Sequence, residues 1–154
     1  GCKRFTSDEW YLDAKTAIER AFALEGIDES KIAMIGASIG SDGVADGCAY
    51  LNTIYPTICK GAVSFSPGNY LNVDFEEMVA QLGGESEPKP IWCFYSEDDI
   101  DSANVCGNIA GNNYQSYPYS GNAVFSNGHG MNLITPISDP NPLEKVLEFL
   151  ELVF

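Results

Sequence analysis

Positive charge is the scarcest property of this sequence. Only 8 of the 154 residues are Lys or Arg, against 22 Asp and Glu, so the formal net charge is -14. A surface of that sign repels phosphate groups, which makes nucleic acids and anionic membranes poor partners. We therefore expect neither a nucleic acid nor a membrane as a partner.

Long hydrophobic runs and clusters of metal ligands are also lacking. No uninterrupted apolar stretch approaches the roughly 20 residues that a membrane-spanning helix needs, and no signal-peptide pattern begins the sequence. The five cysteines form no C-x-x-C pair and no cluster with the single histidine, which argues against a zinc site. We expect no metal and no organic cofactor.

The cysteines leave the redox compartment open. In an oxidising compartment Cys48 could pair with Cys59, or Cys93 with Cys106, whereas a buried, inert thiol is the other reading of Cys93 because it sits in an apolar run. The location of the protein stays open. An extracytoplasmic location is weakly favoured by the low Lys and Arg content and by the Asn/Tyr/Ser/Gly-rich segment 111–121.

What the sequence does contain is a regular alternation of apolar strands and amphipathic helices. A hydrophobic content of 45% and a charged content of 19% are typical of a folded protein, and we expect one domain over 1–154. Strands that alternate with helices predict a mostly parallel sheet with helices on both faces, a three-layer α/β/α sandwich. The predicted strands are 32–35, 62–65, 91–95 and 123–125; the predicted helices are 8–22, 39–54, 75–82, 102–110 and 143–154, with a loop over 111–121.

The segment Gly36-Ala37-Ser38-Ile39-Gly40 lies between a predicted strand and a predicted helix. The bare G-x-S-x-G pattern is weak, since glycine and serine are common. Its position is more informative, because a nucleophile elbow requires a sharp strand-to-helix turn that leaves the serine exposed at the helix N-terminus. The other readings are a tight turn with an incidental serine, or a phosphate-binding loop.

A serine nucleophile needs a base, and His129 is the one histidine of the chain. It follows the last predicted strand, so its loop should open at the same sheet edge as the loop of Ser38. The acidic segment after the strand at 91–95 offers an orienting carboxylate. The candidate acids are Glu97, Asp98, Asp99 and Asp101.

The chain order of serine, acid and histidine is that of α/β hydrolases. Several segments resemble the dienelactone-hydrolase-like and carboxylesterase-like branch of that superfamily: "WYLDAKTAIERAFALEGID", "KIAMIGASIGS", "GAVSFSPGNY", "PIWCFYSEDDIDSA" and "NGHGMNL". The resemblance implies Ser38 as the nucleophile, His129 as the general base and Asp99 as the acid, with Asp98 as runner-up. It also implies that the backbone N–H of Ile39 is one oxyanion-hole donor.

The sequence departs from that family before Ser38. Only 37 residues precede it, enough for one helix and one strand, whereas the family places its first strands and the second oxyanion donor upstream. We therefore expect a C-terminal portion of an α/β-hydrolase fold that lacks the N-terminal strands. Such a chain could be a fragment, a minimal version, or one completed by another chain, and its open sheet edge would favour a homo-oligomer or a domain swap.

The leading hypothesis is a serine hydrolase that cleaves carboxylic esters of small acyl substrates through an acyl-enzyme. A non-catalytic half-hydrolase that serves as a binding or assembly module is the alternative. A third reading is a flavodoxin-like or receiver-like domain that would hold a metal through Asp98 and Asp99.

Overall fold

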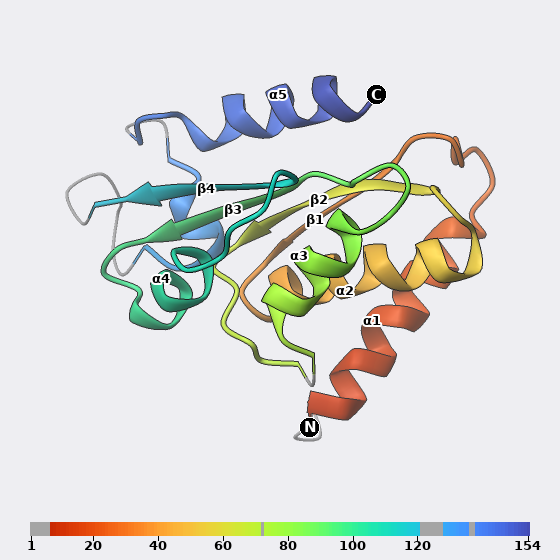
Figure 1. The fold of residues 1–154 in the computed structure, drawn as a ribbon, viewed down its shortest axis with the longest axis horizontal. Coiled ribbons are helices and arrows are strands. Elements are labelled where there is room, and N and C mark those ends of the chain that lie inside the picture. The colour runs from red at the N-terminus through yellow and green to blue at the C-terminus, as the bar shows by residue number, and fades with distance from the viewer. Residues whose placement is uncertain (1–6, 72, 121–127, 136–137) are drawn as a thin grey trace.

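The computed structural model describes residues 7–71, 73–120, 128–135 and 138–154. Its strands form one parallel sheet in the order β1-β2-β3-β4, so each strand neighbours the next along the chain (Figure 1). The elements are α1 (Ser7–Phe22), β1 (Ile32–Ala37), α2 (Ile39–Ile54), β2 (Cys59–Phe65), α3 (Phe75–Gly83), β3 (Ile91–Ser96), α4 (Ile100–Cys106), β4 (Tyr114–Tyr119), the short 3-10 helix η2 (Gly130–Leu133) and α5 (Pro142–Val153).

Two apolar cores, one on each face of the sheet, hold three layers together. The first core joins the sheet to α2, α3 and α4, with α1 packed over α2, and the second joins it to η2 and α5 (Figure 1). Alternate residues of β3 enter opposite cores, since Cys93 belongs to the first and Phe94 to the second. The expected three-layer α/β/α sandwich with a parallel sheet is therefore confirmed.

Stacked aromatic rings join three strands within the second core. The ring of Phe94 lies 4.7 Å from that of Phe65 and 4.7 Å from that of Tyr117, measured between centroids. Such pairs add about 0.5–1.5 kcal/mol each beyond the apolar area they bury. This packing adds to the backbone pairing that joins β2, β3 and β4, whose carboxyl ends carry polar loops.

β4 corrects the prediction of a loop over 111–121. Tyr117 and Tyr119 are buried in the second core, while polar Gln115 and Ser116 interrupt the apolar pattern that would have signalled a strand. Pro118, which cannot donate a backbone hydrogen bond, is tolerated because β4 pairs on one side only, with β3, among the described residues. The strand predicted at 123–125 lies outside the described residues.

The other predicted elements are present with small changes of boundary. The predicted helix at 102–110 begins earlier and ends earlier, at Ile100 and Cys106, because Gly107 caps its end. Both possible cysteine pairs are disulfides, Cys48–Cys59 between α2 and β2 and Cys93–Cys106 between β3 and α4. None of the described helices is long and apolar enough to cross a membrane.

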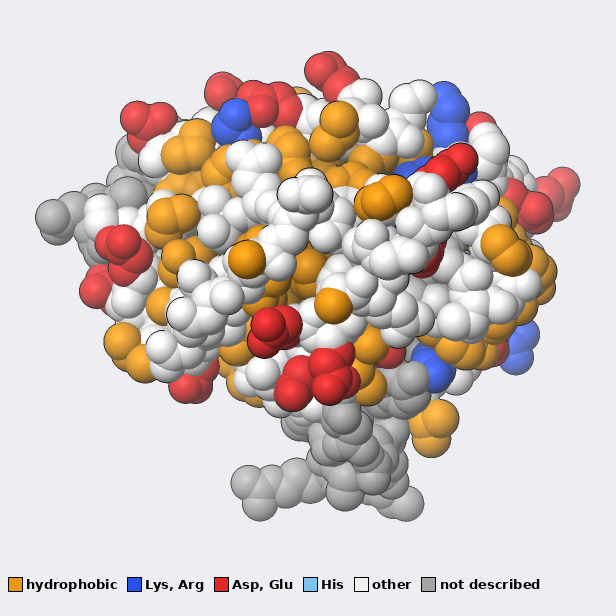
Figure 2. All heavy atoms as spheres, in the orientation of Figure 1, with side chains coloured by type: hydrophobic (Ala, Val, Ile, Leu, Met, Phe, Trp, Pro, Cys, Tyr) orange, Lys and Arg blue, Asp and Glu red, His pale blue; other side chains and the backbone are white. Residues whose placement is uncertain are grey.

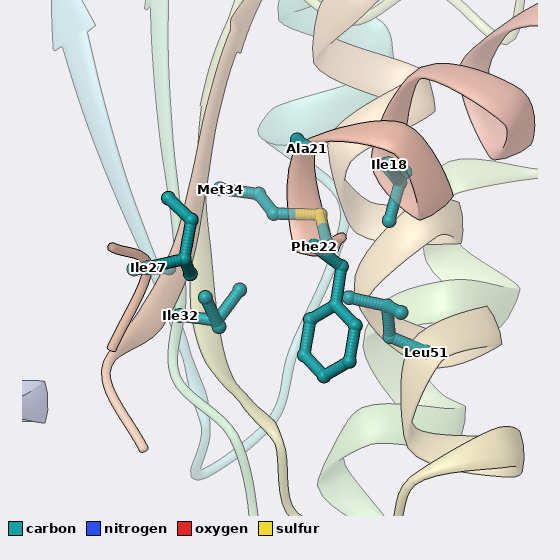
Figure 3. A pocket seen from close by; sticks show the side chains of 8 residues that line it. Ile18, Ala21, Phe22, Ile27, Ile32, Met34 and Leu51 are labelled. Atoms are coloured by element: carbon teal, nitrogen blue, oxygen red, sulfur yellow. The ribbon is translucent and has the colours of Figure 1, made fainter. Parts of the chain in front are cut away.

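The outer edge of β1 is open in the described part of the chain. β1 pairs only with β2, and Ile35 in its middle is 45% exposed. Two apolar hollows run beside it. One, of about 200 Å³, lies between α1 and the start of β1 (Figure 3); the other, of about 290 Å³, lies beside Ile35, Ile39 and Gly40.

Charge is distributed over the surface as the composition suggests. Acidic side chains are spread over the face shown in Figure 2, with few Lys and Arg among them. Apolar side chains also reach this face, which is expected of folded proteins because polar atoms cannot cover the whole surface.

Candidate active site

Ser38 occupies a strained turn between β1 and α2. Its backbone has φ 55° and ψ -128°, the left-handed side of φ that non-glycine residues rarely adopt, and it stands at the N-cap of α2. Its N–H donates to the carbonyl of Phe65 at the end of β2, 2.8 Å away. The neighbouring strand therefore helps to hold the turn in a conformation that costs about 1–3 kcal/mol.

The two glycines of the motif differ in their surroundings. A Cβ on Gly36 would overlap the carbonyl of Gly40 and reach within 2.8 Å of Val44 Cγ1, so the turn needs glycine there. A Cβ on Gly40 would meet no atom within 4 Å, because Gly40 faces the hollow beside the open edge of β1. Crowding in the turn thus explains the first glycine and not the second.

The structure brings His129 to Ser38 across 91 positions of sequence. His129 Nε2 lies 2.7 Å from Ser38 Oγ, a hydrogen-bonding distance. Glycines in the left-handed region flank the histidine, Gly128 at φ 54° and Gly130 at φ 59°. The N–H of Gly130 donates to the buried hydroxyl of Ser66, 2.9 Å away, which ties the histidine loop to the end of β2.

Asp99 is the acid that reaches the histidine. Its Oδ2 lies 2.7 Å from His129 Nδ1, and the two side chains are 13% and 30% exposed. Asp98, the runner-up, is exposed, and its backbone N–H donates to Ser96 Oγ at 3.2 Å. Asp99 stands at the N-cap of α4, and its position after β3 brings the carboxylate to the sheet edge that carries Ser38.

Ile39 is the first residue of α2, where a helix leaves its backbone N–H groups without intrahelical partners. The positive end of the helix dipole adds to the attraction of that position for negative charge. The predicted oxyanion donor therefore follows Ser38 directly in the sequence, at the N-terminus of α2.

A buried carboxylate that the sequence reasoning missed holds the loop after β2. Asp42 accepts hydrogen bonds from the N–H groups of Gly68, Asn69 and Tyr70 at 3.2, 3.3 and 2.9 Å. Burial raises the pKa of its carboxyl above the usual value, against the lowering effect of these three bonds. A charged residue among the small residues of a predicted buried helix was the signal that could have found it.

Tyr70 lies on the loop that Asp42 anchors and shares the electrostatic environment of the site. Burial raises the pKa of its phenol, and the negative charges of Asp99, Asp101 and Asp42 raise it further. Among the described residues, no group of three or more His, Cys, Asp or Glu is placed to hold a metal ion.

Comparisons with known proteins find likeness in structure and not in sequence. No family model matches the chain, and no curated protein matches it significantly. A Pyrobaculum calidifontis esterase superposes with a TM-score of 0.57 at 17% identity, over 94% of this chain and 61% of its own. An alpha-beta hydrolase from Vibrio vulnificus gives a TM-score of 0.59 at 16% identity, over 90% and 55%.

A structure from a study of two fungal esterases from Rhizomucor miehei gives a TM-score of 0.52 at 16% identity, over 94% of this chain and 58% of its own. The chain thus spans between 55% and 61% of the length of these structures. At such identities the likeness bears on the fold alone, and membership of the superfamily and of its branch stays a prediction. The four parallel strands and their flanking helices form part of an α/β-hydrolase fold.

Proposed function

We propose that this protein is a serine hydrolase that cleaves carboxylic esters of small acyl substrates. Ser38 is the nucleophile, His129 the general base and Asp99 the residue that orients His129. The observation that carries the proposal is the unbroken hydrogen-bonded series from Asp99 Oδ2 through the imidazole to Ser38 Oγ, assembled from three separate loops. The esterases among the structural neighbours support the reaction class.

The proposed reaction has two halves. In the first, Ser38 Oγ bonds to the ester carbonyl carbon while His129 Nε2 takes the hydroxyl proton; collapse of the tetrahedral intermediate breaks the bond to the alcohol oxygen, which receives that proton. In the second, His129 takes a proton from water, the resulting hydroxide adds to the acyl carbon, and Ser38 leaves with the proton. Each cycle yields one acid and one alcohol.

The negative charge of the tetrahedral intermediate needs prepositioned donors. The N–H of Ile39 supplies one of them, and the loss of a single donor of this kind typically costs a factor of about 10²–10³ in turnover. The second donor is expected from a segment beside β1, whose outer edge is open in the described residues. We therefore expect acylation to be easier to detect than rapid turnover.

A fluorophosphonate probe tests the proposal, because it forms a stable bond with an activated serine. Mass spectrometry should find one adduct per chain, on the peptide that contains Ser38. The adduct should be lost in Ser38→Ala and strongly reduced in His129→Ala. Ser30→Ala removes an exposed hydroxyl that donates to the Asp28 carboxylate and serves as the matched control. An intact protein that stays unlabelled would refute the proposed activity.

The alternative function is a binding or assembly module. The observation that favours it is the open edge of β1 in the described residues, where an exposed Ile35 lines an apolar hollow. Such an edge can pair with a second copy of this chain, strand against strand. Light scattering should then give a dimer mass that Ile35→Lys returns to the monomer mass; a monomer in the unmutated protein would exclude this mode of assembly.

A further inference from the structure

We propose that Ser102 is the positioning residue for Asp99, a role that rests on the proposed function of the site. Ser102 Oγ lies 2.8 Å from Asp99 Oδ2, the same carboxylate oxygen that lies 2.7 Å from His129 Nδ1. An ionised carboxylate only accepts hydrogen bonds, so the hydroxyl donates. One oxygen of Asp99 is thus held between the hydroxyl of Ser102 and the imidazole.

The hydroxyl of Ser102 is committed to this contact by its surroundings. Ser102 is fully buried, with 0% exposure, so bulk water does not compete for the hydroxyl. A helical serine can also bond to a backbone carbonyl one turn earlier. Here the hydroxyl is directed to the Asp99 side chain instead.

Other contacts fix the helix that carries both residues. α4 is joined to β3 through the Cys93–Cys106 disulfide, and Tyr114 on β4 donates from its hydroxyl to the carbonyl of Cys106 at 2.8 Å. The position of α4 therefore does not depend on Ser102. Ser102 instead sets the rotation of the Asp99 carboxylate, and thereby the negative charge that Asp99 Oδ2 presents to His129.

This arrangement has an electrostatic consequence. A donor on Asp99 Oδ2 withdraws negative charge from the oxygen that faces the imidazole, so its removal should make protonated His129 more stable. The other titratable groups nearby are Tyr70 on the loop after β2 and the carboxylates of Asp101 and Asp42, whose negative charges act on the Tyr70 phenol together with that of Asp99. A substitution at Ser102 leaves all three of these groups in place.

The single histidine of the chain provides a direct measurement. In tag-free protein, the imidazole proton signal followed by NMR against pH reports on His129 alone. Ser102→Ala should move its titration midpoint upward by about 0.5 pH, because the carboxylate loses a donor. Ser102→Thr retains a hydroxyl and should bring the midpoint back to that of the unmutated protein. A midpoint in Ser102→Ala that is unmoved, or that moves downward, would overturn the proposal.

Kinetics provide the second readout. With p-nitrophenyl acetate, Ser102→Ala should lower kcat about tenfold and leave KM unchanged, because the hydrogen bond orients the base and touches no substrate. Asn141→Ala removes the N-cap of α5, whose Oδ1 accepts from Leu143 N at 3.0 Å, and controls for a general loss of stability. It should leave kcat unchanged, and an equal loss of kcat in both variants would count against Ser102.

The two proposals fail in distinguishable ways. If the unmutated protein takes up no fluorophosphonate, the hydrolase proposal fails, whereas the NMR titration still decides whether Ser102 governs the charge at Asp99. If the unmutated protein is labelled and Ser102→Ala is labelled at the same rate with an unchanged histidine titration, the positioning role fails and the hydrolase proposal stands.

Discussion

Replacing Asp99 by asparagine removes the charge that faces His129 and keeps the size of the side chain. Two unit charges 2.7 Å apart attract by about 6 kcal/mol at an effective dielectric constant of about 20. The two side chains are 13% and 30% exposed, so solvent screens part of this attraction. If screening removes half of it, an attraction of about 3 kcal/mol remains. That energy corresponds to a loss in kcat of about 100-fold, because each 1.36 kcal/mol is a factor of ten.

Asp98→Asn is the matched control, because it makes the same chemical change one residue away on an exposed side chain. We expect kcat and the rate of fluorophosphonate labelling to fall in Asp99→Asn and to stay within twofold of the unmutated protein in Asp98→Asn. Urea unfolding of both variants separates a loss of activity from a loss of folded protein. Equal activities for the two variants would refute the assignment of the acid, and the reverse order would move it to Asp98.

Three further perturbations test other parts of the site. Labelling should rise with pH as His129 becomes neutral and able to accept the Ser38 proton, so a rate that is flat from pH 5 to 8 would contradict its role. Burial raises the pKa of the Asp42 carboxyl in the folded protein above its value in the unfolded chain. The contribution of Asp42 to the free energy of unfolding is therefore largest at a pH below the unfolded-state pKa, and it falls as the pH rises through the folded-state pKa. The free energy of unfolding of the unmutated protein relative to that of Asp42→Asn, measured with urea, should therefore decrease from pH 4 to 7. An increase over that range would mean that folding lowers the pKa of Asp42. Gly36→Ala should destabilise the protein by about 1–3 kcal/mol through overpacking, whereas Gly40→Ala, in open space on a helix, should stabilise it by about 0.5–1 kcal/mol; equal effects would contradict the described turn.

The fold class could be predicted because its signals are local. The apolar run 91–95 predicts a strand buried on both faces of a sheet, and the small and apolar residues of 39–54 predict a helix; both elements appear at those positions. β4 escaped prediction because polar Gln115 and Ser116 interrupt its apolar pattern and its strand character comes from Tyr117 and Tyr119 packing on Phe94. That contact joins residues more than 20 positions apart.

Some features of the candidate site could likewise be predicted from local sequence, whereas others depend on contacts between distant segments. Gly36-Ala37-Ser38 could be recognised in the sequence, because a strand-to-helix turn needs glycine where backbone segments approach closely. The family resemblance favoured Asp99 over Asp98, but its contact with His129 depends on the packing of α4 on β3, which the sequence does not show. The strand-to-helix turn at Ser38 therefore followed from local sequence, whereas the two disulfides and the contact of Asp99 with His129 were decided by the tertiary structure, because each depends on which distant segments lie side by side.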